Sequence, residues 1–215
     1  MEQFDLQRLV LTLPGILIGL TLHEFMHAYV ADKCGDDTAR EHGRITFNPL
    51  KHIDPIGILF IIFAGFGWAK PVSFNEEKLR NPKRDTMLIA VAGPFANVVI
   101  AIVTSAVFVA LINSHPSPES ESTTLLLNCL LNCIFINWGL FVFNMIPIPP
   151  LDGSHLIFHT VRHRPELYQK IYRYGTLALF GILLIESRTN ITILPIGYAV
   201  NFLGEGVLKF FGYGM

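Results

Sequence analysis

The residues with the clearest chemical potential lie at positions 23–27, where the chain reads His23-Glu24-Phe25-Met26-His27. Side chains four positions apart share one face of a helix, so both imidazoles can bind a single metal ion. The carboxylate of Glu24 is placed beside them to act as a general base. This H-E-x-x-H pattern is short and also occurs without metal, but it favours a zinc hydrolase site.

A catalytic zinc site needs a third protein ligand and an open position for water. Asp152 is the best candidate, because it follows Pro147, Pro149 and Pro150. Prolines free backbone groups that must line something polar when they lie in an apolar segment. An N-cap role at the start of a helix explains Asp152 equally well, and His155 is a rival ligand.

Other repeated side chains have simpler explanations. His155, His159 and His163 recur every four residues and form one stripe, which suits a second metal or a pH sensor but is more often the polar face of a helix. Cys129 and Cys133 have the same spacing, and we interpret them as small apolar fillers.

The composition is that of an integral membrane protein. Of 215 residues, 51% are hydrophobic and only 15% are charged, whereas soluble domains carry about 25% charged residues. The apolar residues form blocks, which predicts a single membrane domain over 1–215. The net charge of −1 gives no basis for nucleic-acid binding. The sequence after Met1 lacks the features of a signal peptide.

Five apolar stretches are long enough to be membrane helices, at about 9–31, 87–112, 125–147, 170–186 and 191–211. The last is the weakest and can lie at the interface instead. With a shorter sixth stretch at 55–67, we expect an all-α polytopic membrane protein with about five to six transmembrane helices.

Lysine and arginine predict the orientation of these helices. They are frequent in the connectors 33–54, 70–86 and 162–173 and absent from 113–124. The positive-inside rule places the first three in the cytoplasm and the last outside. The motif at 23–27 then lies near the cytoplasmic end of the first helix.

The same rule puts both ends of 55–67 on one side of the membrane. We therefore expect a re-entrant segment, with a full short span as the alternative. The flanking pieces 44–47 and 71–74 have strand-like compositions. They predict a small membrane-embedded β-hairpin within about 44–74.

Two further polar breaks interrupt the apolar segments. Gly93-Pro94 and Asn97 suit close helix packing and a hydrogen bond between helices. Asn144 adjoins the proline break and is a better catalytic candidate than Asn137, two turns earlier.

Together these residues resemble the site-2 proteases, zinc metalloproteases that cut other proteins inside the membrane. The resemblance rests on three family motifs in order, H-E-x-x-H at 23–27, G-P-x-x-N at 93–97 and N-x-x-P-x-x-P-x-D-G at 144–153. The segment 43–57 looks like the small bacterial branch of that family. No stretch is long and polar enough for the PDZ or CBS domains of many relatives.

The resemblance implies that His23, His27 and Asp152 bind one Zn²⁺ per chain and that Glu24 is the catalytic acid and base. It implies that Asn144 helps to hold the reacting carbonyl, and it favours Asp152 over His155. The expected partners are the lipid bilayer and a transmembrane protein substrate, with the active site toward the cytoplasmic side of a bacterial plasma membrane.

Two other functions use the same polar residues. One is an ion transporter, and the other is a catalytically inactive membrane scaffold. The oligomeric state does not follow from the sequence.

Overall fold

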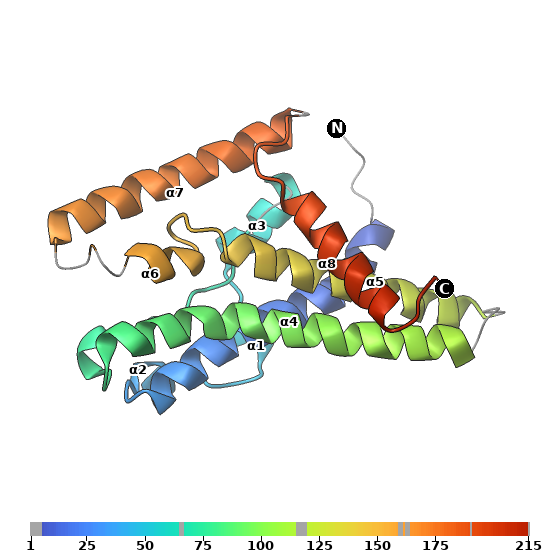
Figure 1. The fold of residues 1–215 in the computed structure, drawn as a ribbon, viewed down its shortest axis with the longest axis horizontal. Helices are drawn as coiled ribbons and strands as arrows, with labels where there is room; N and C mark the ends of the chain where they lie inside the picture. Colours follow the sequence, from blue (N-terminus) through green and yellow to red (C-terminus); the bar gives the residue numbers. More distant parts are fainter. Residues whose placement is uncertain are drawn as a thin grey trace.

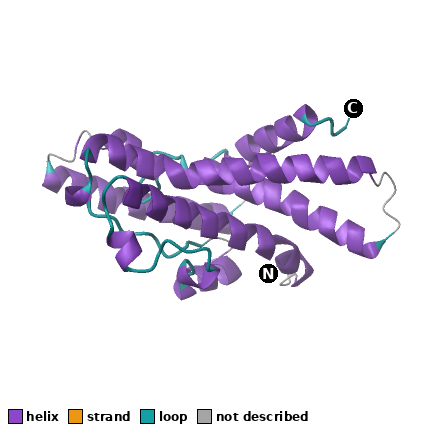
Figure 2. Ribbon diagram, turned by 90° about the horizontal axis from the view of Figure 1, so that it is seen from below, coloured by secondary structure: helices purple, strands orange, loops and turns teal. Residues whose placement is uncertain are grey.

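The computed structural model describes residues 6–64, 67–114, 120–158, 161, 164–189 and 191–214. This part of the chain is mostly helical and contains no strand (Figure 2). Its helices are α1 (Leu6–Lys33), α2 (Thr38–Glu41), α3 (Pro55–Ala64), α4 (Pro82–Ser114), α5 (Glu121–Asn144), α6 (Gly153–Phe158), α7 (Pro165–Arg188) and α8 (Ile196–Phe210). Short 3₁₀ turns lie at Pro49–Lys51 and Glu76–Lys78.

Within the described residues, three helices are long and apolar enough to cross a membrane, and they coincide with the first three expected segments. They are Val10–Lys33, Pro82–Ser114 and Glu121–Asn144. The expectation of an integral membrane protein is confirmed. Helix α8 has 15 residues, fewer than the roughly 20 that a perpendicular span needs. A total of five to six spans therefore stays a prediction.

Helices α1, α4 and α5 pack on one another, and α8 lies across α5 and α4 (Figure 1). Two glycines of α1 bring its backbone close to α5. A Cβ added at Gly15 would lie 2.8 Å from Cα of Cys133, and one added at Gly19 would lie 2.8 Å from Oδ1 of Asn137. Small residues one turn apart are typical of such close contacts between membrane helices.

The hairpin expected at 44–47 and 71–74 is not formed in the described residues. Instead, Ile53 and Ala69 make one isolated antiparallel bridge, and the 10-residue helix α3 follows. Pro71 has no N–H to give to a ladder. The N–H groups of Val72 and Asn75 donate to the carboxylates of Glu24 and Asp36. One carboxylate on α1 and one just beyond its end thus accept N–H groups that a neighbouring strand would otherwise have bonded.

Helix α7 lies along one edge of the molecule, away from α4 (Figure 1). It contacts the rest of the chain through Phe180, whose ring centroid lies 5.7 Å from that of Trp68. A Cβ added at Gly175 would lie 2.9 Å from Cδ of Pro149. The helix therefore packs near the proline break between α5 and α6.

Candidate metal centre

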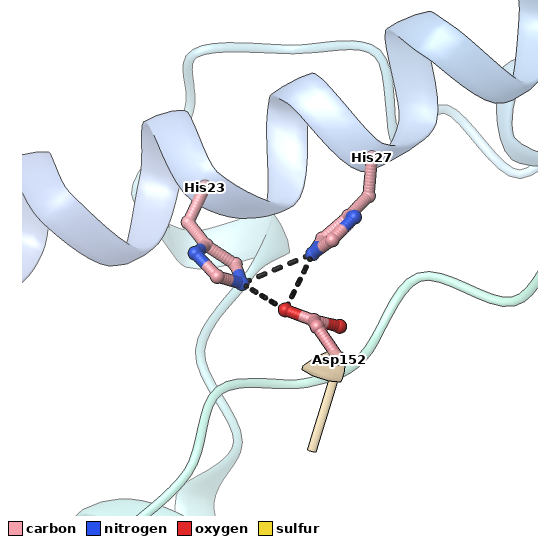
Figure 3. Close-up of side chains that lie close together, drawn as sticks. All are labelled: His23, His27 and Asp152. Atoms are coloured by element: carbon pink, nitrogen blue, oxygen red, sulfur yellow. Dashed lines mark hydrogen bonds and ion pairs between the residues drawn. The ribbon is translucent and has the colours of Figure 1, made fainter. Parts of the chain in front are cut away.

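Three side chains from two distant parts of the chain converge beside α1 (Figure 3). His23 and His27 lie one helical turn apart on α1, and their Nε2 atoms are 3.0 Å from each other. Oδ2 of Asp152, in the turn before α6, lies 3.2 Å from each of these nitrogens. The histidines are 4% and 8% exposed, so the group is shielded on the helix side.

The outer nitrogens of both imidazoles are hydrogen-bonded. Nδ1 of His27 lies 2.7 Å from the carbonyl oxygen of Ile89, and Nδ1 of His23 lies 2.7 Å from Oδ1 of Asn97. A carbonyl oxygen only accepts, so Nδ1 of His27 must carry the hydrogen. Its Nε2 then presents a lone pair toward Asp152.

The three inner atoms have the character of a cation site. Two nitrogen lone pairs and a carboxylate oxygen face one another at contact distance, and they repel unless a cation lies among them. Oδ2 of Asp152 is buried and accepts no well-formed hydrogen bond, despite its two 3.2 Å contacts. Two imidazoles and one carboxylate are a donor set that zinc prefers. The residues present therefore fit the expected metal.

The charge state of Asp152 agrees with this assignment. Burial by itself would raise the pKa of the Asp152 carboxyl, but the positive charge and hydrogen bonds of His27 and His23 together hold the pKa well below its ordinary value. The carboxylate is thus ionised when a positive charge lies at this position, and a divalent cation supplies the same charge.

Glu24 is buried beside the two histidines, with 7% of its surface exposed. Its Oε2 accepts a hydrogen bond of 3.0 Å from the backbone N–H of Val72. The segment around Val72 is itself fixed, since Arg44 donates to the carbonyl oxygen of Lys70 and Asp36 accepts from the N–H of Asn75. The carboxylate of Glu24 is therefore oriented by a segment that is itself hydrogen-bonded at both ends.

The remaining candidates make other contacts. Asn144 ends α5, and its side chain donates to the carbonyl oxygen of Leu140 at 3.0 Å. His155 is not part of the three-residue group, and its ring lies 6.4 Å from that of Phe74. Burial lowers the pKa of His155. His159 and His163 lie outside the described residues.

Gly93 and Asn97 are closer to the site than their motif suggested. A Cβ added at Gly93 would lie 2.3 Å from Nε2 of His27 and 2.7 Å from Nε2 of His23. The interpretation as helix packing was incomplete, because α4 packs here directly on the two imidazoles. The close α1–α5 contact had a sequence signal of its own, the G-x-x-x-G at Gly15 and Gly19.

The family comparison agrees with this geometry. A model of peptidase family M50 matches residues 11–128 and 112–185. The chain belongs to peptidase family M50. The resemblance to the site-2 proteases is confirmed, and this M50 peptidase is an intramembrane zinc metalloprotease. Neither the inactive scaffold nor the ion transporter has support from the comparison.

Individual relatives align with most of this chain. YwhC of Bacillus subtilis (strain 168), provisionally named a zinc metalloprotease, is 40% identical over 206 residues, which is 94% of this chain and 90% of the relative. Rip2 of Mycobacterium tuberculosis (strain H37Rv), named in the same way, is 28% identical over 82% of this chain and 66% of its own length. No solved structure matches the chain.

Proposed function

We propose that this M50 peptidase hydrolyses peptide bonds in or near transmembrane segments of other proteins, with zinc held by His23, His27 and Asp152. The observation that carries the proposal is the convergence of these side chains beside a helix that is apolar enough to span a membrane. Zinc bound by such ligands would supply a nucleophile at neutral pH, since it lowers the pKa of its bound water to about 7.

Glu24 is the general base in this proposal. Its carboxylate takes a proton from the attacking water and returns it to the leaving amine. The hydrogen bond from Val72 orients one oxygen of this carboxylate, and the other oxygen carries the proton. Asn144 donates to the oxygen of the reacting carbonyl after its amide turns away from Leu140.

The proposed site lies toward the cytoplasmic side of a bacterial plasma membrane. The positively charged connectors on either side of α3 support this orientation. A peptide bond within a substrate helix is hydrogen-bonded and shielded, so the substrate must unwind before cleavage. Water then has a short route to the histidines, because they lie in the second half of α1.

The test uses the full chain purified in detergent with a model transmembrane substrate. Wild type and Glu24→Gln should each contain one zinc, while the variant should cleave about 10² to 10⁴ times more slowly. Glu205→Gln is the matched control, because Glu205 lies on α8 and pairs only with nearby Lys209 at 3.4 Å in the described contacts. A metal-free wild type prepared without chelators, or full activity in Glu24→Gln, would refute the proposal.

A further inference from the structure

We propose that Asn137 is a positioning residue that acts through Asn97 to present Nε2 of His23 to the metal. The inference rests on the proposed function in one respect, that His23 is a zinc ligand. Asn137 lies on α5 and Asn97 on α4, and both side chains are fully buried, at 0% exposure. They form a continuous chain of hydrogen bonds from α5 to the imidazole of His23.

Four hydrogen bonds make up this series. Nδ2 of Asn137 donates to the carbonyl oxygen of Cys133 at 2.8 Å. Oδ1 of Asn137 accepts from Nδ2 of Asn97 at 2.9 Å, and that same Nδ2 also donates to the carbonyl oxygen of Gly19 at 3.2 Å. Oδ1 of Asn97 is then left to face Nδ1 of His23 at 2.7 Å.

Two backbone carbonyl groups determine how each amide in this series of hydrogen bonds is oriented. An amide oxygen placed against the carbonyl of Cys133 would repel it, so Asn137 must turn its nitrogen there and its oxygen toward Asn97. The amide of Asn97 is fixed for the same reason, by the oxygen of Asn137 and the carbonyl of Gly19. The orientation of each amide thus follows from the hydrogen-bond network.

The orientation decides which nitrogen of His23 can bind a metal. Oδ1 of Asn97 can only accept, so Nδ1 of His23 carries the hydrogen and Nε2 keeps its lone pair. A flipped Asn97 would turn its NH₂ group toward Nδ1. The hydrogen of the neutral ring would then move to Nε2, where it would block the ligand position.

The close packing of α1 on α5 keeps these hydrogen bonds short. A Cβ at Gly19 would lie 2.8 Å from Oδ1 of Asn137 and 2.8 Å from Cδ1 of Leu140. Only a glycine at position 19 lets α1 approach α5 so closely. The carbonyl oxygen of this glycine can then join the network. Unpaired amides are costly away from water, so each buried asparagine must find these partners, and a single arrangement satisfies both.

The experiment measures the zinc affinity of the full chain by competition with a chelator. Asn97→Leu should weaken zinc binding about 10- to 100-fold, as expected for an outer partner of a ligating histidine. Asn137→Leu should weaken it about tenfold, at the lower end of that range, because the bond to Gly19 still restrains Asn97. Ser105→Ala is the matched control, since Ser105 is equally buried on α4 but donates only to Ala101 of its own helix.

The double variant distinguishes positioning from general support of the fold. If Asn137 acts through Asn97, then adding Asn137→Leu to Asn97→Leu should cause no further loss of affinity. Additive losses, or an unchanged affinity in Asn137→Leu, would overturn the inference.

Nitrogen NMR of the metal-free protein reads the tautomer directly. In wild type the hydrogen of His23 should reside on Nδ1, and in Asn137→Leu a fraction should move to Nε2. If Asn137→Leu does not fold, Asn137→Ala removes the same acceptor without added bulk, and an unchanged tautomer there overturns the inference. A wild type that binds no zinc contradicts the proposed function instead.

Discussion

The two sides of the histidine pair are built differently. On the side of α4 and α5, the buried amide of Asn97 and the carbonyl oxygen of Ile89 contact the imidazoles, and Gly93 leaves no room for even a methyl group. On the opposite side, the segment 69–75 is held mainly through backbone groups, as in the bond from Val72 to Glu24. Nearby Phe47 and Leu50 are 65% and 76% exposed.

This difference assigns a separate task to each side. The α4 and α5 side fixes the direction of the ligand lone pairs, because it is close-packed and its hydrogen bonds form one network. The other side presents exposed apolar side chains on the connector after α2, while its segment 69–75 is fixed by hydrogen bonds to Arg44, Glu24 and Asp36. A hollow of about 250 Å³ between α1 and the connector after α2 lies there, lined by Leu17, Ile18, Thr21, Leu22, Phe47 and Pro49. We expect substrates to approach from this side.

The largest expected effect is the loss of a ligand. Asp152→Ala should remove zinc from the purified protein and abolish cleavage, because two histidines alone leave the metal with too few protein ligands. His155→Ala should keep its zinc, since His155 lies outside the three-residue group. Metal analysis of both variants checks the assignment, and the opposite pattern would make His155 the third ligand.

Gly93→Ala tests the close-packed side. The new Cβ would lie 2.3 Å from Nε2 of His27, and relieving such an overlap typically costs about 1–3 kcal/mol. We expect zinc affinity to fall about 5- to 150-fold, the equivalent of that energy if all of it is expressed in binding. Gly139→Ala on α5 is the control, because its Cβ would have no neighbour within 4 Å. Equal affinities would mean that α4 can move away from the histidines.

Val72→Pro tests the open side. Proline removes the N–H that orients Glu24, and a hydrogen bond to a charged group is worth about 1.5–3 kcal/mol. We expect cleavage to slow about tenfold or more while the zinc content stays at one per chain. Val72→Ala keeps the N–H and serves as the control. A loss of zinc in the proline variant would show that the two sides are not separate.

The smallest expected effect concerns Phe47, whose ring stacks on Phe25 at 4.3 Å between centroids. Phe47→Ala should raise KM about fivefold with kcat unchanged, since Phe47 lines the hollow and an aromatic contact with a substrate side chain is worth about 1 kcal/mol. Phe202→Ala on α8 is an exposed control remote from the hollow. A fall in kcat instead would place Phe47 with the catalytic residues.

Local sequence patterns were sufficient to predict an integral membrane protein and the two histidines of the site. The spacing of His23 and His27 determines that their side chains share a helix face, and apolar blocks identify the three long helices. The strand-like composition at 71–74 was misleading, because composition does not reveal that Glu24 accepts the N–H of Val72 and that Asp36 accepts the N–H of Asn75, just beyond it. The choice between ladder and side-chain partners depends on neighbours distant in sequence.

The sequence by itself determined the chemistry of this protein, its ligand types and its apolar setting. Only the tertiary structure decided how Asp152 meets histidines more than a hundred positions earlier (Figure 3), and how Asn137 and Asn97 control the ring of His23. The physical reason is that helix periodicity is local. The direction of a lone pair depends on hydrogen bonds between helices, and these exist only once the helices have packed.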